Sequence, residues 1–341
     1  MTTSPPFLSL CIMTYNRAGT LRETLDSFLA QAEAHPDVEV VISDNGSTDD
    51  TQEVVRGYCA RHPRIRYCRN PVNVQFDGNV IACVENALGE YMAYCSDDDL
   101  ATPGLIDGLL KDLREVRPIA AYINHTPFFH NNPAETTAPT QPVVRKVFTN
   151  PTEFFLYTGM GFLSAIVLKT SEARKYTSKV VRGRSTGHVD IAARVVLGSA
   201  GPFLFDGTLT VLARIDYQSG YDPLRYGAMN SSLVYRELQA EGLLTQADVE
   251  WHNRKTIRLF LQRLIVSNRL KGAKAVIPAS ELLKLYGRDP LFYIYAGPLL
   301  LIPPTLLRWI ALPLRSGLRF RRKWRLKHGK PSAPPTHLAP S

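Results

Sequence analysis

The sequence predicts an α/β protein built on an open, mainly parallel sheet with helices on its faces. Short apolar runs alternate with stretches of helical spacing over the first 116 residues, which is the order expected of strands joined by helices. Three of the apolar runs end in polar clusters, namely TYNR (14–17), SDNGSTDD (43–50) and SDDD (96–99). Because the carboxyl ends of parallel strands share one edge of a sheet, the three clusters are expected to meet there.

The expected elements alternate regularly up to residue 116. Residues 18–35 illustrate the helical pattern, because Leu21, Leu25, Phe28 and Leu29 recur at three- and four-residue spacing. The expected strands span residues 7–15, 38–44, 64–70 and 90–96. The expected helices span residues 18–35, 51–62, 79–89, ended by Gly89, and 103–116, with Pro103 in the first turn.

The pattern weakens beyond residue 120, and no internal repeat is present. Residues 130–142 are expected to form a loop, and residues 161–169 and 204–215 are expected to form strands. From residue 228 the sequence is helical in character. Residues 256–270 carry one apolar face, consisting of Ile257, Phe260, Leu261, Leu264 and Ile265, with arginines elsewhere.

Charge and cysteine content limit the possible class of protein. The net charge is +9, and residues 308–330 contain nine Lys or Arg and no acidic residue, so the rest of the chain is neutral. The five cysteines form no CxxC motif, and Cys11, Cys83 and Cys95 lie in apolar runs typical of buried thiols. These features favour a reducing compartment over a disulfide framework or a zinc site. Residues 1–17 lack the charged start and apolar core of a signal peptide, so we expect a cytoplasmic protein.

Three adjacent carboxylates, Asp97, Asp98 and Asp99, follow the strand expected at residues 90–96. A solvated turn with a helix N-cap would explain them, since Asp is favoured in both. Clustered carboxylates near phosphates would instead hold a bridging divalent metal, which cancels their repulsion. Asp44, just past another expected strand, can accept a hydrogen bond from a base or ribose. No P-loop occurs and no GxGxxG follows a strand, which argues against a kinase or a Rossmann dehydrogenase.

Four successive stretches carry a resemblance to a known family. They are LSLCIMTYNRAGTLRETLDSF, VEVVISDNGSTDDT, NPVNVQFDGNV and GEYMAYCSDDDLATPG. In this order and spacing, over residues 7–116, they resemble the motifs of family 2 glycosyltransferases, and more narrowly those of the abequosyltransferase-type enzymes that build bacterial O-antigens. The resemblance implies a GT-A fold, a nucleoside-diphosphate sugar donor, Mn²⁺ or Mg²⁺ as cofactor, and inversion at the anomeric carbon.

The resemblance also implies which residues form the donor site. Thr14, Tyr15 and Arg17 would line the nucleotide pocket, and Asp44 would hold the base. Two residues of the third stretch would approach the ribose or the diphosphate, namely Asp77 and Asn79.

At the implied metal site, the common family pattern is Asp-x-Asp-Asp. Ser96 stands at its first position here, so Asp98 is expected to bind the metal, with Asp99 as a further candidate ligand. Ser96 and Asp97 are expected among the nucleotide-binding residues, although Asp97 and Asp99 would also fit as acceptor contacts or as supports for the metal-binding residue. Gln75 replaces a family glycine, which would reshape the edge of the diphosphate pocket.

Family members carry a later acidic base, and STGHVDIAARVVLG (185–198) is its best match. Asp190 would take the proton from the acceptor hydroxyl as that oxygen attacks the anomeric carbon. The alternative is that Asp190 only caps the following helix. His188 would contact the acceptor or the diphosphate, or lie at the surface. The stretch ARIDYQSGYD (213–222) would close over the donor phosphates, with Arg214 and Tyr217 as candidates.

The chain is thus expected to hold a GT-A domain at residues 1–227, with a nucleotide half to about residue 120 and an acceptor half after it. A helical region at 228–330 and a disordered tail at 331–341 would follow. Prolines interrupt the uncharged apolar run at 291–307, so its helices are expected to lie in the membrane interface, with Trp309 and Trp324 at headgroup depth and the basic residues on anionic lipid. A spanning or re-entrant hairpin, and a buried core helix with a solvated basic tail, are the alternatives.

The expected protein is an inverting glycosyltransferase, peripheral on the cytoplasmic face of the inner membrane. Its partners would be a nucleoside-diphosphate sugar and a polyprenyl-linked glycan acceptor, and the apolar run beside the basic tail argues against nucleic acid as the partner. A nucleotidyltransferase is one alternative, but it would need a glycine-rich basic phosphate loop, of which TYNRAGT is a poor version. A non-catalytic membrane scaffold is another, and the pair Asp98–Asp99 together with Asp190 argues against it.

Overall fold

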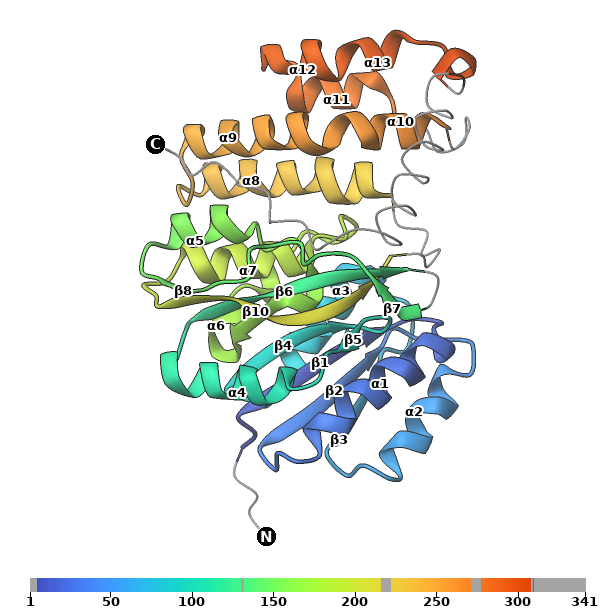
Figure 1. Ribbon diagram of the computed structural model, residues 1–341, viewed down its shortest axis with the longest axis vertical. Helices are drawn as coiled ribbons and strands as arrows, with labels where there is room; N and C mark the ends of the chain where they lie inside the picture. The colour runs from blue at the N-terminus through green and yellow to red at the C-terminus, as the bar shows by residue number, and fades with distance from the viewer. Residues whose placement is uncertain (1–4, 130–131, 216–221, 271–276, 308, 310–341) are drawn as a thin grey trace. The chain divides into compact units, whose positions relative to one another are not determined.

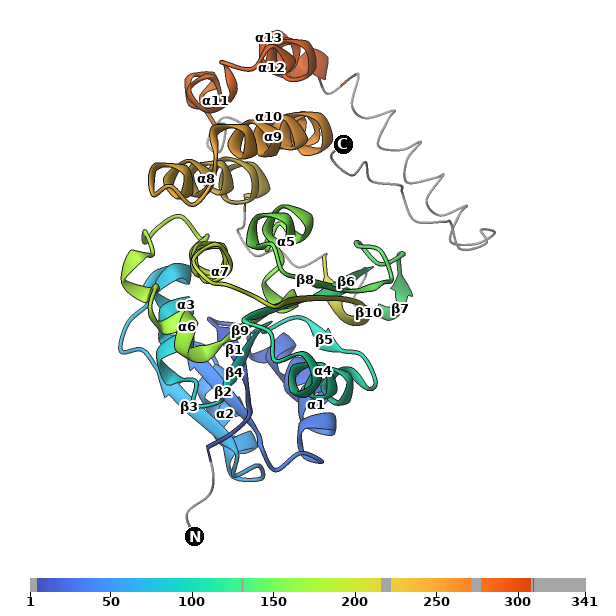
Figure 2. The same ribbon diagram turned by 90° about the vertical axis from the view of Figure 1, so that its left-hand side faces the viewer.

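The structure is a computed structural model in which residues 5–129, 132–215, 222–270, 277–307 and 309 are described. It separates into two compact units, one up to Gln218 and one from Ser219 onward (Figures 1 and 2). We call the first the sheet unit, because it contains all the described strands, and the second the helical unit.

The sheet unit begins with the predicted alternation of strands and helices. Its first four strands pair in parallel in the order β3-β2-β1-β4. All residues of β1 and β2 are buried, which explains their continuous apolar runs. The strands are β1 (Leu8–Thr14), β2 (Val38–Asp44), β3 (Ile65–Arg69) and β4 (Tyr91–Ser96). The helices are α1 (Ala18–Ala32), α2 (Thr51–Cys59), α3 (Gln75–Asn86) and α4 (Leu105–Val116). The α/β prediction is confirmed here.

Beyond β4 the sheet becomes mixed. Strand β9 (Ile166–Lys169) lies between β4 and β6 (Ala120–Phe129) and is antiparallel to both. Strand β10 (Phe203–Arg214) is parallel to β6 but antiparallel to the short strands β5 (Leu100–Ala101) and β8 (Arg145–Phe148). The expectation of a mainly parallel sheet is therefore wrong for this half. Antiparallel neighbours need no long crossover helix, so short returning segments can fill the sheet.

Two segments differ from the prediction within this mixed half. Strand β7 (Asn132–Thr136) pairs with β6 inside the segment expected to be a loop. Its residues are mostly exposed, so the sequence carries no apolar alternation there. Of the strand expected at 161–169, only the last four residues form β9, because the short 3-10 helix η1 (Leu163–Ala165) precedes them.

Two helix ends also differ from the prediction. Pro103 lies before α4, because Gly104 is the N-cap and adopts a left-handed φ of 78°. Helix α3 ends at Asn86, since Ala87 is already extended, and Gly89 is therefore not its cap residue.

Helices cover both faces of the sheet. On one face, α1 packs with α2 and with α4. On the other face, α3 packs with α6 (Thr170–Arg174) and α7 (Gly187–Leu197), and α5 (Pro151–Thr158) packs on α7 (Figure 2). A second short 3-10 helix, η2 (Thr177–Lys179), precedes α7. With both faces covered, the loops that follow the strands lie at the edges of this layered structure.

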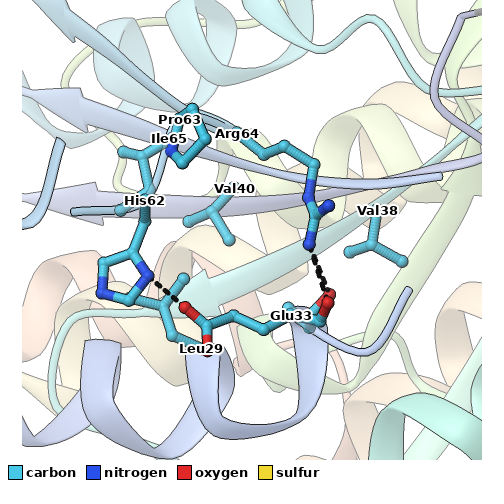
Figure 3. A pocket seen from close by; sticks show the side chains of 9 residues that line it. Leu29, Glu33, Val38, Val40, His62, Pro63, Arg64 and Ile65 are labelled. Carbon is cyan, nitrogen blue, oxygen red and sulfur yellow. Dashed lines mark hydrogen bonds and ion pairs between the residues drawn. The ribbon is translucent and has the colours of Figure 1, made fainter. Parts of the chain in front are cut away.

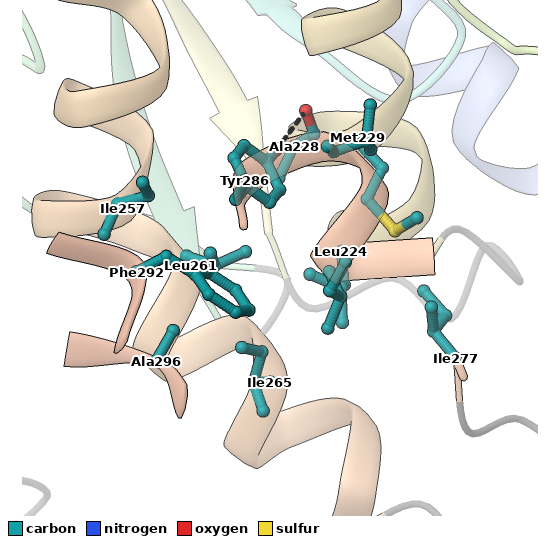
Figure 4. Packing of buried hydrophobic residues seen from close by; sticks show 12 residues of the cluster. Leu224, Ala228, Met229, Ile257, Leu261, Ile265, Ile277, Tyr286, Phe292 and Ala296 are labelled. Atoms are coloured by element: carbon teal, nitrogen blue, oxygen red, sulfur yellow. Dashed lines mark hydrogen bonds between the residues drawn. The ribbon is translucent and has the colours of Figure 1, made fainter. Parts of the chain in front are cut away.

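The helical unit is a stack of short helices around one apolar core. Ile257, Leu261 and Ile265 are directed into this core together with Tyr286 and Phe292 (Figure 4). The apolar face predicted for residues 256–270 is therefore covered within the unit, apart from Phe260, which is 53% exposed. The elements are η3 (Pro223–Met229), α8 (Asn230–Ala240), α9 (Gln246–Thr256), η4 (Ile257–Leu261), α10 (Gln262–Leu270), α11 (Ala279–Tyr286), α12 (Pro290–Tyr295) and α13 (Gly297–Leu301), of which η3 and η4 are π-helical.

The apolar run at 291–307 is partly core and partly surface. Phe292 and Ala296 are buried, whereas Ile294, Leu301 and Trp309 are 67%, 85% and 78% exposed. Among the residues that the structure describes, no helix combines the length and hydropathy needed to cross a membrane. Trp324 and the predicted tail at 331–341 lie outside the described residues.

Candidate active site at the carboxyl ends of the strands

The polar strand ends meet at one edge of the sheet, as predicted. In the register of the sheet, Thr14 at the end of β1 lies beside Asp44 at the end of β2, and Asp44 lies beside Arg69 at the end of β3. On the other side of β1, Met13 lies beside Ser96 at the end of β4. Strand order changes direction at β1 and β4, and such a switch point is where open α/β sheets bind ligands.

The three aspartates form a buried cluster at this switch point. Asp97, Asp98 and Asp99 are 4%, 9% and 3% exposed, so they are not a solvated turn. Arg17, from the loop after β1, donates to both of the first two: its Nη1 lies 2.9 Å from Asp97 Oδ1 and 2.6 Å from Asp98 Oδ2. Ser96 Oγ donates to the other oxygen of Asp98, at 2.5 Å. A single guanidinium therefore serves two neighbouring carboxylates.

Burial and mutual repulsion perturb this cluster. Burial raises the pKa of Asp97 to about 6, against the opposing effect of Arg17, and the neighbouring charge of Asp98 raises it further. Burial and the charge of Asp98 raise the pKa of Asp99 to about 7. Carboxyl groups with perturbed pKa values of this kind concentrate at functional sites.

Asp99 and Arg214 join the cluster to the far half of the sheet. Asp99 accepts hydrogen bonds from Ser164 Oγ, at 2.6 Å, and from the Arg214 backbone N–H, at 3.1 Å. The Arg214 guanidinium donates to the Asp98 carbonyl and to Glu23, and it stacks over the Phe128 ring. Arg214 was predicted to contact the donor phosphates. Its side chain is only 1% exposed and braces the back of the aspartate loop.

Asp44, predicted to hold the base, is fully buried and anchors a turn. Its Oδ1 accepts from the Ser47 backbone N–H, at 2.8 Å, and its Oδ2 accepts from the Tyr67 hydroxyl, at 2.6 Å. Arg69 Nε lies 3.4 Å from the same Oδ2. Burial and the Asp44 contact raise the pKa of Tyr67, so its hydroxyl stays protonated and donates. The predicted contact of Asp44 with the base stays a prediction.

Two asparagines that the sequence analysis did not single out hold these loops together. Asn16 donates its backbone N–H to Ser47 Oγ and accepts from the Thr48 backbone N–H at 2.7 Å. Asn45 accepts from the Val74 backbone N–H and donates to the carbonyl of Gln75. Both asparagines follow directly after a strand, and this was the signal in the sequence that could have identified them. Asn tolerates left-handed and turn conformations, and its side chain hydrogen-bonds neighbouring backbone amides.

The turn after Asn45 requires a glycine at position 46. The φ of Gly46 is 75°, a left-handed value that favours glycine. A Cβ at this position would lie 2.9 Å from the Val72 backbone carbon, so the two loops approach too closely for a side chain.

Asp77 and Asn79, predicted near the ribose or diphosphate, are buried and bonded inside the protein. Asn79 exchanges hydrogen bonds with Ser43 at the end of β2: its Oδ1 accepts from Ser43 Oγ at 2.6 Å and its Nδ2 donates to the Ser43 carbonyl at 3.1 Å. Asp77 is fully buried and accepts from the backbone N–H groups of Arg184, Ser185 and Gly187. Their predicted ligand contacts stay predictions.

Asp190 is 1% exposed and lies in the fourth position of α7, with Arg194 one turn later as its ion-pair partner. The N-cap of α7 is Thr186, so the alternative that Asp190 caps the helix is wrong. His188 is buried rather than at the surface, against the Phe76 ring and 3.4 Å from the Gly161 carbonyl oxygen. Burial lowers the pKa of His188 to about 4, which keeps the imidazole neutral.

The remaining predicted residues fall in three classes. Tyr15 is 41% exposed and free to contact a ligand, whereas Thr14 is buried beneath the loop. Tyr217 lies outside the described residues. In the described part of the chain, no group of three or more His, Cys, Asp or Glu side chains is arranged as a metal-binding cluster.

A cavity of about 220 Å³ lies elsewhere in the sheet unit. It is lined by Val38 and Ile65, the first residues of β2 and β3, and by Leu29, His62 and Arg64 (Figure 3). These are the amino ends of the strands, the opposite end from the aspartate cluster. The cavity is therefore separate from the candidate site.

Comparison with known sequences shows which family the first part of the sheet unit matches. Residues 9–168 match the sequence model of Glycosyl transferase family 2. The chain contains a family 2 glycosyl transferase domain. The match runs from β1 through the aspartate cluster into β9, so it includes the ends of β1, β2, β3 and β4 but not that of β10.

Curated relatives resemble the family 2 domain over part of their length. The uncharacterized protein Mb1547 of Mycobacterium bovis is 30% identical over 192 residues, or 55% of this chain, and the chain spans about half (50%) of that relative. Abequosyltransferase RfbV of Salmonella typhimurium is 42% identical over 100 residues, 29% of this chain and 30% of the relative. The GalNAc(5)-diNAcBac-PP-undecaprenol beta-1,3-glucosyltransferase of Campylobacter jejuni is 32% identical over 111 residues, 32% of this chain and 35% of the relative.

Solved structures share the fold at low sequence identity. Staphylococcus aureus TarS 1–349, in complex with UDP-GlcNAc, has a TM-score of 0.57 and 17% identity, covering 91% of this chain and 92% of that one. The mannosyltransferase PcManGT of Pyrobaculum calidifontis, in complex with GDP-Man and Mn²⁺, has a TM-score of 0.52 and 16% identity, covering 91% and 87%. The chain therefore has a mixed α/β sheet of the GT-A type.

Proposed function

We propose that this protein is an inverting glycosyltransferase of bacterial surface polysaccharide or O-antigen biosynthesis. It moves a sugar from a nucleoside-diphosphate sugar to a hydroxyl of a glycan acceptor carried on a polyprenyl lipid. The observation that carries this proposal is the buried aspartate cluster at the switch point of β1 and β4, within a family 2 domain. The sheet unit carries the chemistry, with donor binding by its first half and acceptor binding by its second.

The aspartate cluster fits a divalent metal such as Mn²⁺ or Mg²⁺. Carboxylate oxygens are the ligands these hard cations prefer, and Mg²⁺ is commonly held by one or two carboxylates plus the phosphates of the substrate. Burial raises the pKa values of Asp97 and Asp99, and a dication bound beside them would favour their ionised forms. Asp98 would hold the metal, with Asp97 and Asp99 beside it. When bound, the metal supplies charge that stabilises the departing nucleoside diphosphate.

The residues around the cluster orient the donor. Arg17 reaches across Asp97 and Asp98 and is the protein's own counter-charge to them. Tyr15 presents an exposed ring beside the nucleotide loops, where it can stack on a base. The turn after Asp44, which would border the nucleotide, is held in place by Asp44, Asn16 and Asn45 through backbone N–H groups.

Asp190 acts as the general base. It accepts the proton of the acceptor hydroxyl while that oxygen attacks the anomeric carbon and the bond to the diphosphate breaks. A single displacement of this kind inverts the anomeric configuration and needs no covalent intermediate. Arg194 provides the opposite charge that a buried carboxylate requires. His188 lies two residues before Asp190 and is neutral. It is therefore suited to hydrogen-bond an acceptor hydroxyl without forming an ion pair with Asp190.

The lipid-linked acceptor is supported by two features of different kind. The Campylobacter jejuni relative is named for a diphospho-undecaprenol substrate. The helical unit exposes Ile294 and Leu301 before the segment with nine Lys or Arg at 308–330, and Trp309 near the start of that segment. Apolar side chains beside basic residues bind anionic membrane surfaces. We propose that this region docks the enzyme on the cytoplasmic face of the inner membrane as a peripheral protein.

The test is a screen of purified protein with UDP-, GDP-, CDP- and dTDP-sugars, with and without Mn²⁺. A glycosyltransferase slowly hydrolyses its own donor, releasing the nucleoside diphosphate and a free sugar of inverted configuration. A nucleotidyltransferase would release pyrophosphate from a nucleoside triphosphate instead. A non-catalytic scaffold would bind a nucleotide sugar and leave it intact, which would overturn the proposal.

A further inference from the structure

The loop that leads into α7 is held by one side chain from another helix. The backbone N–H groups of Arg184 and Ser185 both donate to Asp77 Oδ2, each at 2.9 Å. The N–H of Gly187, the first residue of α7, donates to Asp77 Oδ1 at 2.8 Å. Ser185 has a φ of 57°, a left-handed value that costs energy in a residue with a side chain and persists only where neighbours impose it.

Asp77, which lies on α3, therefore caps the N-terminal end of α7. The N-cap residue of α7, Thr186, makes no side-chain cap hydrogen bond of its own. The first N–H groups of a helix lack partners within the helix, and a carboxylate there also complements the helix dipole. Asp77, at the third position of α3, supplies both the acceptor and the charge.

The contact leaves no room for a ligand. Asp77 is 0% exposed. A Cβ added to Gly187 would lie 3.1 Å from Asp77 Oδ1 and 3.4 Å from its Cα, so the two helices touch at this point. Two residues beyond Asp77, Asn79 is bonded to Ser43 at the end of β2. Asp77 and Asn79 thus connect the donor-side strand ends to the start of α7 through one turn of α3.

We propose that Asp77 is a positioning residue that fixes the helix carrying His188 and Asp190 relative to the donor half of the site. It acts through backbone hydrogen bonds from Arg184, Ser185 and Gly187 and does not touch the ribose or the diphosphate. The importance of this position rests on the proposed function, since Asp190 is the base only if the chain transfers a sugar. A shift of about 1 Å in a catalytic group can reduce turnover about 10²-fold.

The experiment compares Asp77→Asn with wild type by two measurements. The first is amide hydrogen exchange of residues 184–187, made without any ligand. Asparagine keeps the size of aspartate but places an N–H₂ group where an acceptor is needed, so exchange at these amides should accelerate at least about tenfold. The second is hydrolysis of the donor found in the screen above. The kcat should fall about 10²-fold, while affinity for the corresponding nucleoside diphosphate stays within about twofold.

Asp112→Asn is the matched control. Asp112 is also a buried aspartate of the sheet unit, 4% exposed, but it bonds Arg145. Its substitution should leave exchange at residues 184–187 unchanged. The proposal is overturned if Asp77→Asn weakens nucleotide affinity while exchange at 184–187 stays at the wild-type rate, because Asp77 would then bind the ligand directly. If wild type hydrolyses no donor, the proposed function fails, but the exchange data still decide the cap.

Gly187→Ala tests the same contact from the other helix, should Asp77→Asn fold poorly. Alanine is a better helix former than glycine, so this change would stabilise α7 if the contact did not matter. A Cβ 3.1 Å from Asp77 Oδ1 should instead push the helices apart and reduce kcat with nucleotide affinity unchanged. An unchanged kcat would contradict the proposal.

Discussion

The sheet unit and the helical unit place charged and apolar side chains in opposite ways. Every Asp, Glu or Arg found buried among the described residues belongs to the sheet unit, including Asp97–Asp99, Asp190 and Arg194. More than half of the exposed large apolar side chains belong to the smaller helical unit, most of them at or after Tyr293. Burying charge is costly unless it is paired, and exposing apolar surface is costly unless something covers it.

The difference separates two kinds of function. The sheet unit buries carboxylates at several places, but three adjacent ones, Asp97–Asp99, gather at the carboxyl end of β4, which indicates chemistry there. The helical unit buries its own core of Ile257, Leu261 and Phe292 and still leaves apolar groups exposed, and these are the groups that we propose dock on a membrane. The predictions below test each side of this comparison, beginning with the largest expected effect.

Asp98→Asn should reduce Mn²⁺-dependent donor hydrolysis about a thousandfold. Charge stabilisation by a metal is worth several kcal/mol, and about 1.4 kcal/mol corresponds to tenfold in rate. Asp50→Asn is the matched control, because Asp50 is an exposed aspartate near the same loops without a side-chain cap hydrogen bond. Calorimetry of Mn²⁺ and nucleoside diphosphate gives a second measurement. An unchanged affinity in Asp98→Asn would remove this residue from the metal site.

Asp190→Asn should lower turnover about 10²–10⁴-fold while nucleotide affinity stays unchanged, as expected for loss of a general base. The single change also leaves Arg194 buried without its partner, which can cost about 3–5 kcal/mol of stability. The double variant Asp190→Asn/Arg194→Met removes both charges. It should recover stability in urea denaturation but recover no turnover. Recovery of turnover would mean that Asp190 is structural and that another group is the base.

The sequence was sufficient to predict the strand ends, because apolar runs followed by Thr14, Asp44 and Ser96 carry a local signal. Parallel pairing then brings these residues together without further information. The roles of Asp98 and Asp190 stay predictions. The sequence could not show that Asp44, Asp77 and Arg214 are buried inside the protein, because side chains next to a ligand and side chains that brace the loops around it are the same polar types.

The missed contacts join residues far apart in the chain. Arg17 bonds residues 80 and 81 positions later, and Arg214 bonds Glu23 across 191 positions. Local spacing contains no trace of such pairs. In the mixed half of the sheet, β9 and β10 overlap the strands expected at 161–169 and 204–215, but β8 was missed because its four residues are too few to establish a period.

The buried histidine of the sheet unit predicts a dependence of stability on pH. His188 has a pKa lowered to about 4 by burial, against about 6.5 in the unfolded chain. The unfolded state therefore binds more protons between these values, and stability is lost as the pH falls from about 6.5 toward 4. Relative to His188→Gln, wild type should lose about 2 kcal/mol between pH 7.5 and pH 5, at about 1.4 kcal/mol per pKa unit.

Comparison with the His188→Gln variant is needed because other groups titrate in this range. The raised pKa values of Asp97 and Asp99 act in the opposite direction, since they favour the folded state as the pH falls. These contributions are common to both proteins and cancel in the difference. All three tryptophans, Trp251, Trp309 and Trp324, belong to the helical unit, so fluorescence follows that unit and circular dichroism of the strands follows the other. Parallel stability curves for the two proteins would contradict a neutral buried His188.

The exposed apolar groups of the helical unit should contribute a smaller but specific effect on membrane binding. The triple variant Ile294→Gln/Leu301→Gln/Trp309→Gln should bind phosphatidylglycerol vesicles about tenfold more weakly at 0.15 M salt, since a loss of about 1.4 kcal/mol is expected from partial burial of three side chains. Point substitutions are preferable to removing the chain after Asp289, because that truncation would also delete Phe292 and Ala296 from the core.

The matched control introduces the same chemical change in the sheet unit. Val72, Leu88 and Val143 are 64%, 53% and 59% exposed, and their replacement by Gln should leave vesicle binding unaltered. Each Lys or Arg near an anionic surface contributes about 1 kcal/mol, and salt screens this beyond about 10 Å at 0.1 M. Binding should therefore weaken in both variants as salt rises, through the nine basic residues at 308–330 that both retain. If the helical-unit triple variant bound vesicles as tightly as its control, the exposed apolar groups would not be the membrane contact. The contrast between the two units would then need another explanation, such as a protein partner that covers these groups.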